Sequence, residues 1–258
     1  MTVSLGDRKG KYALVGWLRR VNGRTGRRRN YAGDLDKRAI PLREALHGLV
    51  RFSVDRDEAS YGHCARVAEN AVAVGKILGV SGHDLADLYW SALLHDVGKI
   101  GVSRTTLSKP GRLTEDELDE IRQHPVYGAR LLLALSPLLE PIAHAVQHHH
   151  ERWDGQGYPH SLRKTEIPLS ARIIAAVDVL EALTSERPYR APLRPDQAMV
   201  YIRRCAGTQF DPDVVIALES LFAQGRLAMA DEPIGFIEIG NSGGVQPAAG
   251  VRATIRLS

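Results

Sequence analysis

A run of three histidines, His148 to His150, begins a segment that reads HHHERWDGQGYP and ends at Pro159. The segment continues with an acid, an Asp-Gly pair and a Gly-Tyr-Pro turn, and is more polar and turn-forming than an ordinary core segment. Histidine is the commonest metal-binding side chain of proteins. The segment therefore suggests metal ligands followed by a loop.

Helical spacing separates the three imidazoles of this run. His149 and His150 lie three and four residues after Val146, so they continue the apolar side of the preceding helix. His148 instead lies over Ala145, and it is the weaker ligand candidate.

A carboxylate lies within the most apolar helical segment, SARIIAAVDVLEAL. This residue, Asp178, comes one helical turn after Ile174 and one before Ala182, so it shares their apolar face. A buried carboxylate without a partner costs several kcal/mol or loses its charge. Asp178 therefore needs a partner inside the protein.

Further candidate ligands lie on other segments. His95 and Asp96 end an apolar helix, where adjacent side chains diverge by about 100°, so Asp96 could bridge two ions. His63 shares a helical stripe with Val67, and His124 lies between two helices just before a proline.

Five imidazoles and two carboxylates would thus project from separate helices toward one site. Mixed nitrogen and oxygen ligands suit iron, manganese, zinc or nickel better than calcium. A single core-facing histidine is more often structural, and we keep that interpretation for His47, His83, His144 and His160.

The apolar pattern predicts helices from Ile40 to about Ala223. After a first helix from residue 41, they would span about 57–79, 81–96, 114–124 and 125–133, then a stretch ending in the triple histidine, then 168–183, 195–205 and 212–222. Gly98 would stop the helix that carries His95, and residues 101–112 would form a loop.

Two shorter signals complete the expected elements. Thr114, followed three residues later by Glu117, predicts a capping box at the start of a helix. Beyond Gly225, residues 234–240 and 251–257 alternate as short strands do, and the Gly- and Pro-containing stretch 241–250 would join them.

Charge divides the chain unevenly. Residues 1–38 hold eleven Lys or Arg against three Asp or Glu, an excess of +8, so the remainder carries about −4 of the total of +4. We therefore expect a basic N-terminal arm at 1–39, a helical domain at 40–224 and a β-like or mobile tail at 225–258. The arm is either solvated or contacts nucleic acid, a membrane surface or a protein partner.

Composition favours a soluble, cytoplasmic globular protein. Hydrophobic residues make up 44% of the 258 residues, and no apolar run approaches the roughly 20 residues that span a bilayer. The two cysteines, Cys64 and Cys205, fit a reducing compartment. The oligomeric state is left open.

Four phrases of the sequence together resemble a known family. HDVGK begins at His95, a His-Pro pair follows at His124, HHERWDGQGYP begins at His149, and ARIIAAVDVLEALTSERPYR begins at Ala171. These phrases are similar to those of HD-GYP domains, the bacterial cyclic di-GMP phosphodiesterase branch of the HD superfamily. The resemblance covers roughly residues 55 to 225.

The resemblance implies an all-α, HD-superfamily helical bundle around a binuclear metal site. The implied metal ligands are His63, His95, Asp96, His124, His149, His150 and Asp178. The implied substrate contacts are Lys99, Tyr158, Arg187 and Arg190, and a planar guanidinium suits phosphate.

Two departures from the family pattern bear on the site. Family members with a third metal carry a Glu four residues before the first histidine, where this chain has Ala59, so we expect two divalent ions, iron or manganese before zinc or nickel. Ser161 and Lys164 stand where glycine is usual, which predicts a stiffer loop.

The implied activity is hydrolysis of a cyclic dinucleotide, most readily cyclic di-GMP, to a linear dinucleotide. Bound metal ions would activate water for attack on phosphorus, with Asp96 between them and Lys99 offsetting phosphate charge. Two alternatives remain open: another HD-type nucleotide phosphohydrolase, and a non-catalytic module that senses cyclic di-GMP or docks a partner.

Overall fold

The computed structural model of this chain describes residues 42, 44–51, 61–186, 191–229, 237–239 and 245–247. Residues 44–51 are helical. The named helices are α3 (Tyr61–Ile77), α4 (Gly82–Leu93), α5 (Arg104–Leu107), α6 (Glu115–Arg122), α7 (His124–Leu135), α8 (Glu140–His148), α9 (Leu169–Thr184), α10 (Pro195–Arg204) and α11 (Pro212–Ala223). Three short 3₁₀ helices are η1 (Val97–Gly101), η2 (Pro137–Leu139) and η3 (Lys164–Glu166).

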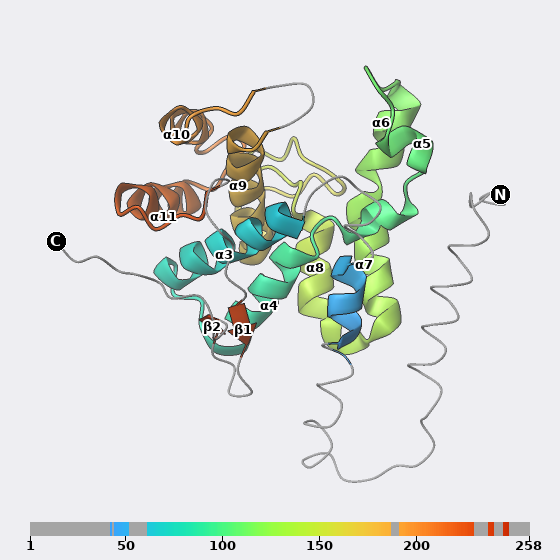
Figure 1. Cartoon of the computed structure of the whole chain (residues 1–258), viewed down its shortest axis with the longest axis horizontal. Helices are drawn as coiled ribbons and strands as arrows, with labels where there is room; N and C mark the ends of the chain where they lie inside the picture. Colours follow the sequence, from blue (N-terminus) through green and yellow to red (C-terminus); the bar gives the residue numbers. More distant parts are fainter. Residues whose placement is uncertain are drawn as a thin grey trace, which may run out of the picture.

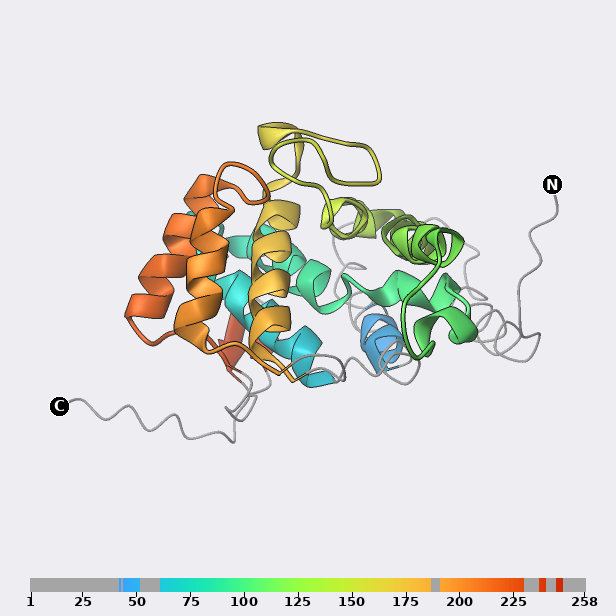
Figure 2. The same cartoon turned by 90° about the horizontal axis from the view of Figure 1, so that it is seen from above.

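Helix α9 forms the centre of the packing. It contacts α3, α8, α10 and α11, and its apolar residues are fully buried on more than one side, among them Ile173, Ile174 and Val177. Small residues such as Ala68 and Ala71 let α3 approach α4 and α9 closely. Both views place α10 and α11 at the end of the molecule opposite α5 and α6 (Figures 1 and 2). The all-α fold expected from the sequence is confirmed.

Several predicted helix ends are confirmed. Ser81 precedes α4, Thr114 and Glu117 form the expected capping box of α6, and Pro168 precedes α9. Residues with a side-chain or backbone preference for helix starts therefore mark these boundaries reliably.

The predicted helix over 81–96 is too long. Helix α4 ends at Leu93, and His95 and Asp96 lie in the turn that follows it. Gly98 does not stop a helix but lies inside η1. The backbone after Leu93 tightens into the 3₁₀ turn, a conformation that apolar spacing does not distinguish from α-helix.

Two further boundaries also differ from expectation. The helix predicted to reach His124 ends at Arg122, and His124 is the first residue of α7. The predicted loop at 101–112 contains the one-turn helix α5, whose N-cap Ser103 accepts a hydrogen bond from the backbone N–H of Thr106.

A small antiparallel pair of strands lies near the C-terminal end. Strand β1 (Ile237–Ile239) falls in the first predicted strand, but its partner β2 (Val245–Pro247) falls in the predicted connection. Residues 251–257, the expected second strand, lie outside the described residues, as do the predicted arm at 1–39 and the expected helix start near residue 57.

Within these described ranges, every helix is too short or too polar to cross a bilayer.

Candidate metal centre

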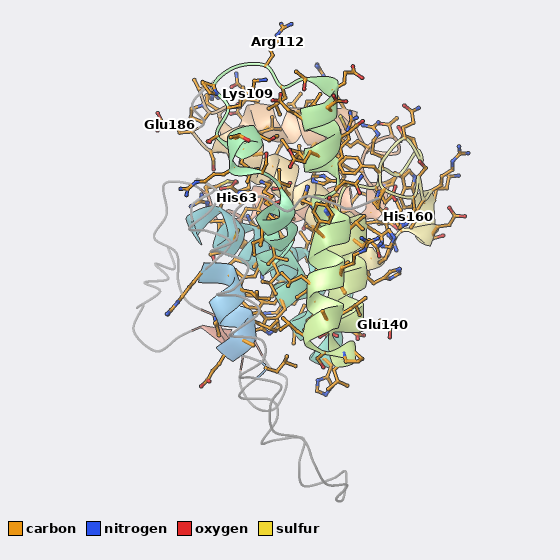
Figure 3. All side chains as sticks on the ribbon, turned by 90° about the vertical axis from the view of Figure 1, so that its right-hand side faces the viewer. His63, Lys109, Arg112, Glu140, His160 and Glu186 are labelled. Carbon is orange, nitrogen blue, oxygen red and sulfur yellow. The ribbon has the colours of Figure 1, made fainter. Side chains whose placement is uncertain are left out.

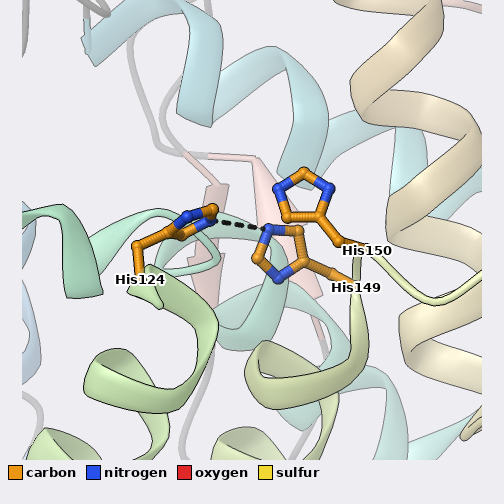
Figure 4. A group of neighbouring side chains, drawn as sticks. All are labelled: His124, His149 and His150. Carbon is orange, nitrogen blue, oxygen red and sulfur yellow. Dashed lines mark hydrogen bonds between the residues drawn. The ribbon is translucent and has the colours of Figure 1, made fainter. Parts of the chain in front are cut away.

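Two groups of ligand atoms meet where α3, the turn after α4, α7, α8 and α9 converge. His63, His95 and Asp178 form one group, and His124, His149 and His150 form the other (Figure 4). Within each group the candidate atoms all lie within 4.8 Å of one another. All seven ligands expected from the sequence, Asp96 included, are therefore brought together, and we call this set the central site.

Asp96 lies between the two groups. Its Oδ2 is 3.4 Å from His95 Nε2, and its Oδ1 is 3.3 Å from His124 Nε2. One carboxylate thus presents an oxygen to each group. Asp96 could therefore be shared by two ions, one held by each group.

Three of the histidines are oriented in the same way. The Nδ1 atoms of His95, His124 and His149 each lie 2.7 Å from the backbone carbonyl three residues earlier. A carbonyl oxygen only accepts, so each Nδ1 carries the proton, and each Nε2 presents its lone pair to the site. Such contacts to the second ring nitrogen fix imidazole ligands in metalloproteins.

His63 is fixed by a carboxylate that the sequence reasoning missed. Glu181 contacts the Nδ1 of His63, and it also accepts two hydrogen bonds from Arg66, at 2.6 and 3.1 Å. Ser185 donates a further bond of 2.6 Å to Glu181. Glu181 lies three residues after Asp178, so helical spacing placed it on the same side of α9.

The electrostatics of the first group favour a cation. Burial lowers the pKa of His63, but hydrogen bonds and charges from Asp178 and Glu181 outweigh it and raise that pKa to about 10. Burial likewise opposes the protonation of His95, yet the charge of Asp96 raises its pKa. A metal ion here would take the place of these protons.

The second group favours neutral imidazoles. Burial and the neighbouring imidazole of His150 hold the pKa of His149 well below its ordinary value, and burial lowers that of His150 to about 4. Neutral imidazole is the form that binds metals. The carboxylate of Asp96, in contrast, stays ionised. Burial raises its pKa, but the positive charges of Lys99 and His95 outweigh burial and hold that pKa well below its usual range.

The site passes a direct test of fit to metal. Of the buried side-chain nitrogens and oxygens in the described chain, His95 Nε2 alone has no hydrogen-bond partner. The Nε2 atoms of His124 and His149 are 3.3 Å apart, although neither has a proton to donate while Nδ1 carries it. Two nitrogens bound at about 2.0–2.1 Å to one ion lie about 3 Å apart. Bound ions would therefore give His95 Nε2 a partner and explain the close approach of the other two nitrogens.

A glycine holds two parts of the site together. A Cβ atom at Gly98 would lie 1.8 Å from the carbonyl oxygen of His124 and 2.4 Å from the nitrogen of Gly128. No other residue permits this approach of η1 to the start of α7. The approach keeps Asp96, two residues before Gly98, beside His124.

The loop after α8 is shaped by its own polar residues. Asp154 accepts from the backbone N–H of Gln156 and from the side chain of Arg152, and Gly155 has a φ of 77°. A Cβ at Gly157 would meet backbone atoms at 2.3–2.6 Å. Asp154, Gly155 and Gly157 therefore shape this loop.

The expected substrate residues are placed only in part. The ring of Tyr158 stacks on His150, with centroids 4.9 Å apart, and burial raises the pKa of its hydroxyl, so the hydroxyl stays protonated. Lys99 Nζ lies 2.8 Å from Asp96 Oδ2. Arg187 and Arg190 lie outside the described residues, as does Ala59.

Comparison with known proteins gives one family. A family model described as HD domain matches residues 48–214. The chain is 38% identical over 181 residues to a cyclic di-GMP phosphodiesterase of Thermotoga maritima, covering 70% of this chain and 49% of that protein. It is 40% identical over 177 residues to the cyclic di-GMP phosphodiesterase response regulator RpfG of Xanthomonas campestris. The match covers 68% of this chain and 47% of that protein.

Another relative differs in its named substrate. It is the 3'3'-cGAMP-specific phosphodiesterase 3 of Vibrio cholerae, 40% identical over 158 residues, which cover 61% of this chain and 34% of that protein. This chain therefore spans about half the length, or less, of the curated relatives it matches.

Solved structures share the fold at lower identity. A cyclic GMP-AMP specific phosphodiesterase of Vibrio cholerae has a TM-score of 0.51 at 24% identity, over 64% of this chain and 44% of that one. An HDG"Y"P protein of Bdellovibrio bacteriovorus has a TM-score of 0.52 at 14% identity, over 74% of this chain and 66% of that one. At these identities the likeness supports the fold alone.

Proposed function

Because this chain belongs to the HD domain family, we propose that it is a metal-dependent phosphodiesterase that hydrolyses a cyclic dinucleotide to a linear one. Cyclic di-GMP is the first candidate substrate, since curated relatives with 38% and 40% identity carry that name and agree with the HD-GYP motifs of this sequence. The single observation that carries the proposal is Asp96, which directs one oxygen to each group of imidazoles.

The assigned ligands form two sets that share Asp96. One set is His63, His95, Asp178 and Asp96, and the other is His124, His149, His150 and Asp96. Nitrogen and oxygen donors of this kind suit iron or manganese, and also zinc or nickel. When bound, such ions lower the pKa of water and offset the negative charge of a phosphate.

The chain's own residues would position the substrate. Lys99 lies beside the shared carboxylate, where its ammonium group would contact a phosphate oxygen of the substrate. Tyr158 keeps a protonated hydroxyl next to His150 and would donate a hydrogen bond. Arg187 and Arg190 follow α9 in sequence, and we assign them to substrate phosphates on the HD-GYP resemblance.

A cytoplasmic location is part of the proposal. Both cysteines are free, and Cys64 is buried, which fits a reducing compartment. The basic arm at 1–39 is proposed as separate from the helical domain, and contact of the arm with nucleic acid, a membrane surface or a protein partner remains an alternative to solvation. The domain itself extends past the expected boundary at 224, because Leu227 is buried in the core and Ala228 forms two hydrogen bonds with the side chain of Asn70.

Product identification tests this function. Anaerobically purified protein, loaded with manganese or iron and assayed for metal content, would be incubated with cyclic di-GMP, 3'3'-cGAMP and a mononucleotide. We expect a linear dinucleotide from a cyclic substrate. Faster phosphate release from the mononucleotide would indicate another HD-type hydrolase, and calorimetric binding without any product would indicate a sensing module.

A further inference from the structure

A second cluster of metal-binding side chains lies outside the central site. His148, Glu151 and His160 bring candidate ligand atoms within 4.8 Å of one another, and the Nε2 of His148 is 3.1 Å from the Nδ1 of His160. His148 ends α8, whereas His160 comes just after the Gly-Tyr-Pro turn. Figure 3 labels His160 at the outer edge of the molecule, well apart from His63 of the central site.

We propose that His148, Glu151 and His160 form a second metal site, which we call the loop site. It binds one zinc-like divalent ion and ties the loop that contains Tyr158 and His160 to the end of α8. Nothing in this inference depends on the phosphodiesterase activity. It rests on the orientation of His148, the burial of Glu151 and the exposure of His160.

The orientation of His148 prepares it as a ligand. Its Nδ1 lies 2.7 Å from the carbonyl oxygen of His144, so Nδ1 carries the proton and Nε2 presents a lone pair toward His160. This arrangement repeats that of His95 and His149 in the central site. His148 is itself buried, with 4% of its surface exposed.

Glu151 supplies an unbalanced negative charge. It is 3% exposed, and its two oxygens accept the backbone N–H groups of His160, at 2.7 Å, and Leu162, at 3.1 Å. Each oxygen keeps a further lone pair. In the described part of the chain no Lys or Arg forms an ion pair with this carboxylate. A buried anion of this kind favours a nearby cation.

The ligand set defines the occupant. Two imidazoles and one carboxylate suit zinc better than calcium or magnesium, and three protein ligands leave one position for water. His160 is exposed, so an ion can enter from solvent. The bound ion would hold His160, and with it the backbone just after Tyr158, against α8.

Zinc uptake tests the loop site. The full chain without a histidine tag would be titrated with Zn²⁺ alone, in competition with a chelating dye that suppresses weak surface binding. We expect His160→Ala to bind one equivalent less than the unchanged protein. The control His83→Ala, which removes an exposed histidine from the start of α4, should keep the full uptake.

Two further measurements separate the loop site from the central site. Asp96→Ala, which weakens the central site, should retain the equivalent that His160→Ala loses. Zinc should also slow hydrogen exchange of backbone amides in residues 151–163 of the unchanged protein but not of His160→Ala. Equal zinc uptake by the unchanged protein and His160→Ala would overturn the proposal, because His148 and His160 would then share only a hydrogen bond.

Discussion

The orientation of each imidazole is decided by what its second nitrogen contacts. Backbone carbonyls hold His95, His124 and His149, whereas the carboxylate of Glu181 holds His63. Sequence spacing predicts which histidines face the interior, but it does not reveal which ring nitrogen faces the ion. That choice depends on the exact position of a carbonyl or carboxylate after packing.

Replacing Glu181 tests its role as a positioning residue. We expect Glu181→Gln to weaken metal binding by about 10–100-fold. The neutral amide attracts the proton on His63 Nδ1 less strongly than the carboxylate does, so Nε2 is less firmly held as the ligand atom. Isothermal titration with Mn²⁺ would measure the change. Glu140→Gln, which alters an exposed carboxylate on α8, serves as the control.

A purely structural role for Glu181 would give a different pattern. Glu181 also binds Arg66 and Ser185, so the variant will lose some stability in any case. If unfolding shifts while manganese affinity of the folded protein stays unchanged, Glu181 does not position the ligand.

At the scale of elements, the turn after α4 matters most for the site. Apolar spacing predicts a helix through His95 and Asp96, but the structure has a turn and then η1. The turn directs Asp96 between the two groups of imidazoles. Long-range contact of η1 with α7, which no local pattern contains, selects this conformation.

Alanine at Gly98 tests this contact. Its Cβ would overlap the backbone of His124, so we expect Gly98→Ala to destabilise the fold by about 1–3 kcal/mol and to reduce metal uptake. Chemical denaturation and metal analysis would measure both. Gly101→Ala is the matched control in η1, because the atoms nearest to its Cβ belong to the Tyr127 ring, which can move, rather than to backbone.

An equal loss of stability and metal uptake in the two glycine variants would contradict this role. The loss would then come from flexibility of η1 rather than from its contact with α7.

The loop after the Gly-Tyr-Pro turn contains two residues in a left-handed backbone conformation that favours glycine. Ser161 and Lys164 have φ values of 55° and 52°. These are the two positions where the HD-GYP resemblance implied glycine. A left-handed conformation costs a non-glycine residue about 1 kcal/mol, so the departures introduce strain as well as side chains.

A pair of substitutions at Lys164 isolates that strain. We expect Lys164→Gly to be about 1 kcal/mol more stable than Lys164→Ala, because both remove the side chain but only glycine relieves the positive φ. Thermal and urea unfolding would give the difference. In ordinary helical backbone the order is reversed, so a more stable alanine variant would show that residue 164 is not left-handed in solution.

For the whole molecule, the convergence of the seven expected ligands could be predicted because each lies in a recognisable motif or on an apolar helical face. Glu181 and the cluster of His148, Glu151 and His160 were missed, since their partners are distant in sequence or come together only through the loop fold. Strand β2 at 245–247 was not predicted, since it falls in the stretch expected to be a connection, and alternation over such short segments does not fix strand pairing.

The fold also explains why the ligands come from so many elements. The central site draws on α3, the turn after α4, α7, the end of α8, and α9. Packing of α3, α4 and α8 against α9, and of α7 against α8 and η1, therefore fixes the distances between ligands. Assembly of the site depends on the complete helical domain rather than on any one motif.

The activity of Asp96→Ala tests the central claim most directly. Manganese- or iron-loaded variant and unchanged protein would be compared for linearisation of cyclic di-GMP, with circular dichroism to verify the fold and metal analysis to verify loading. Loss of the shared ligand should remove several kcal/mol of transition-state stabilisation, a fall of at least about a thousandfold in turnover. Full activity in the folded variant would contradict the assignment of the site.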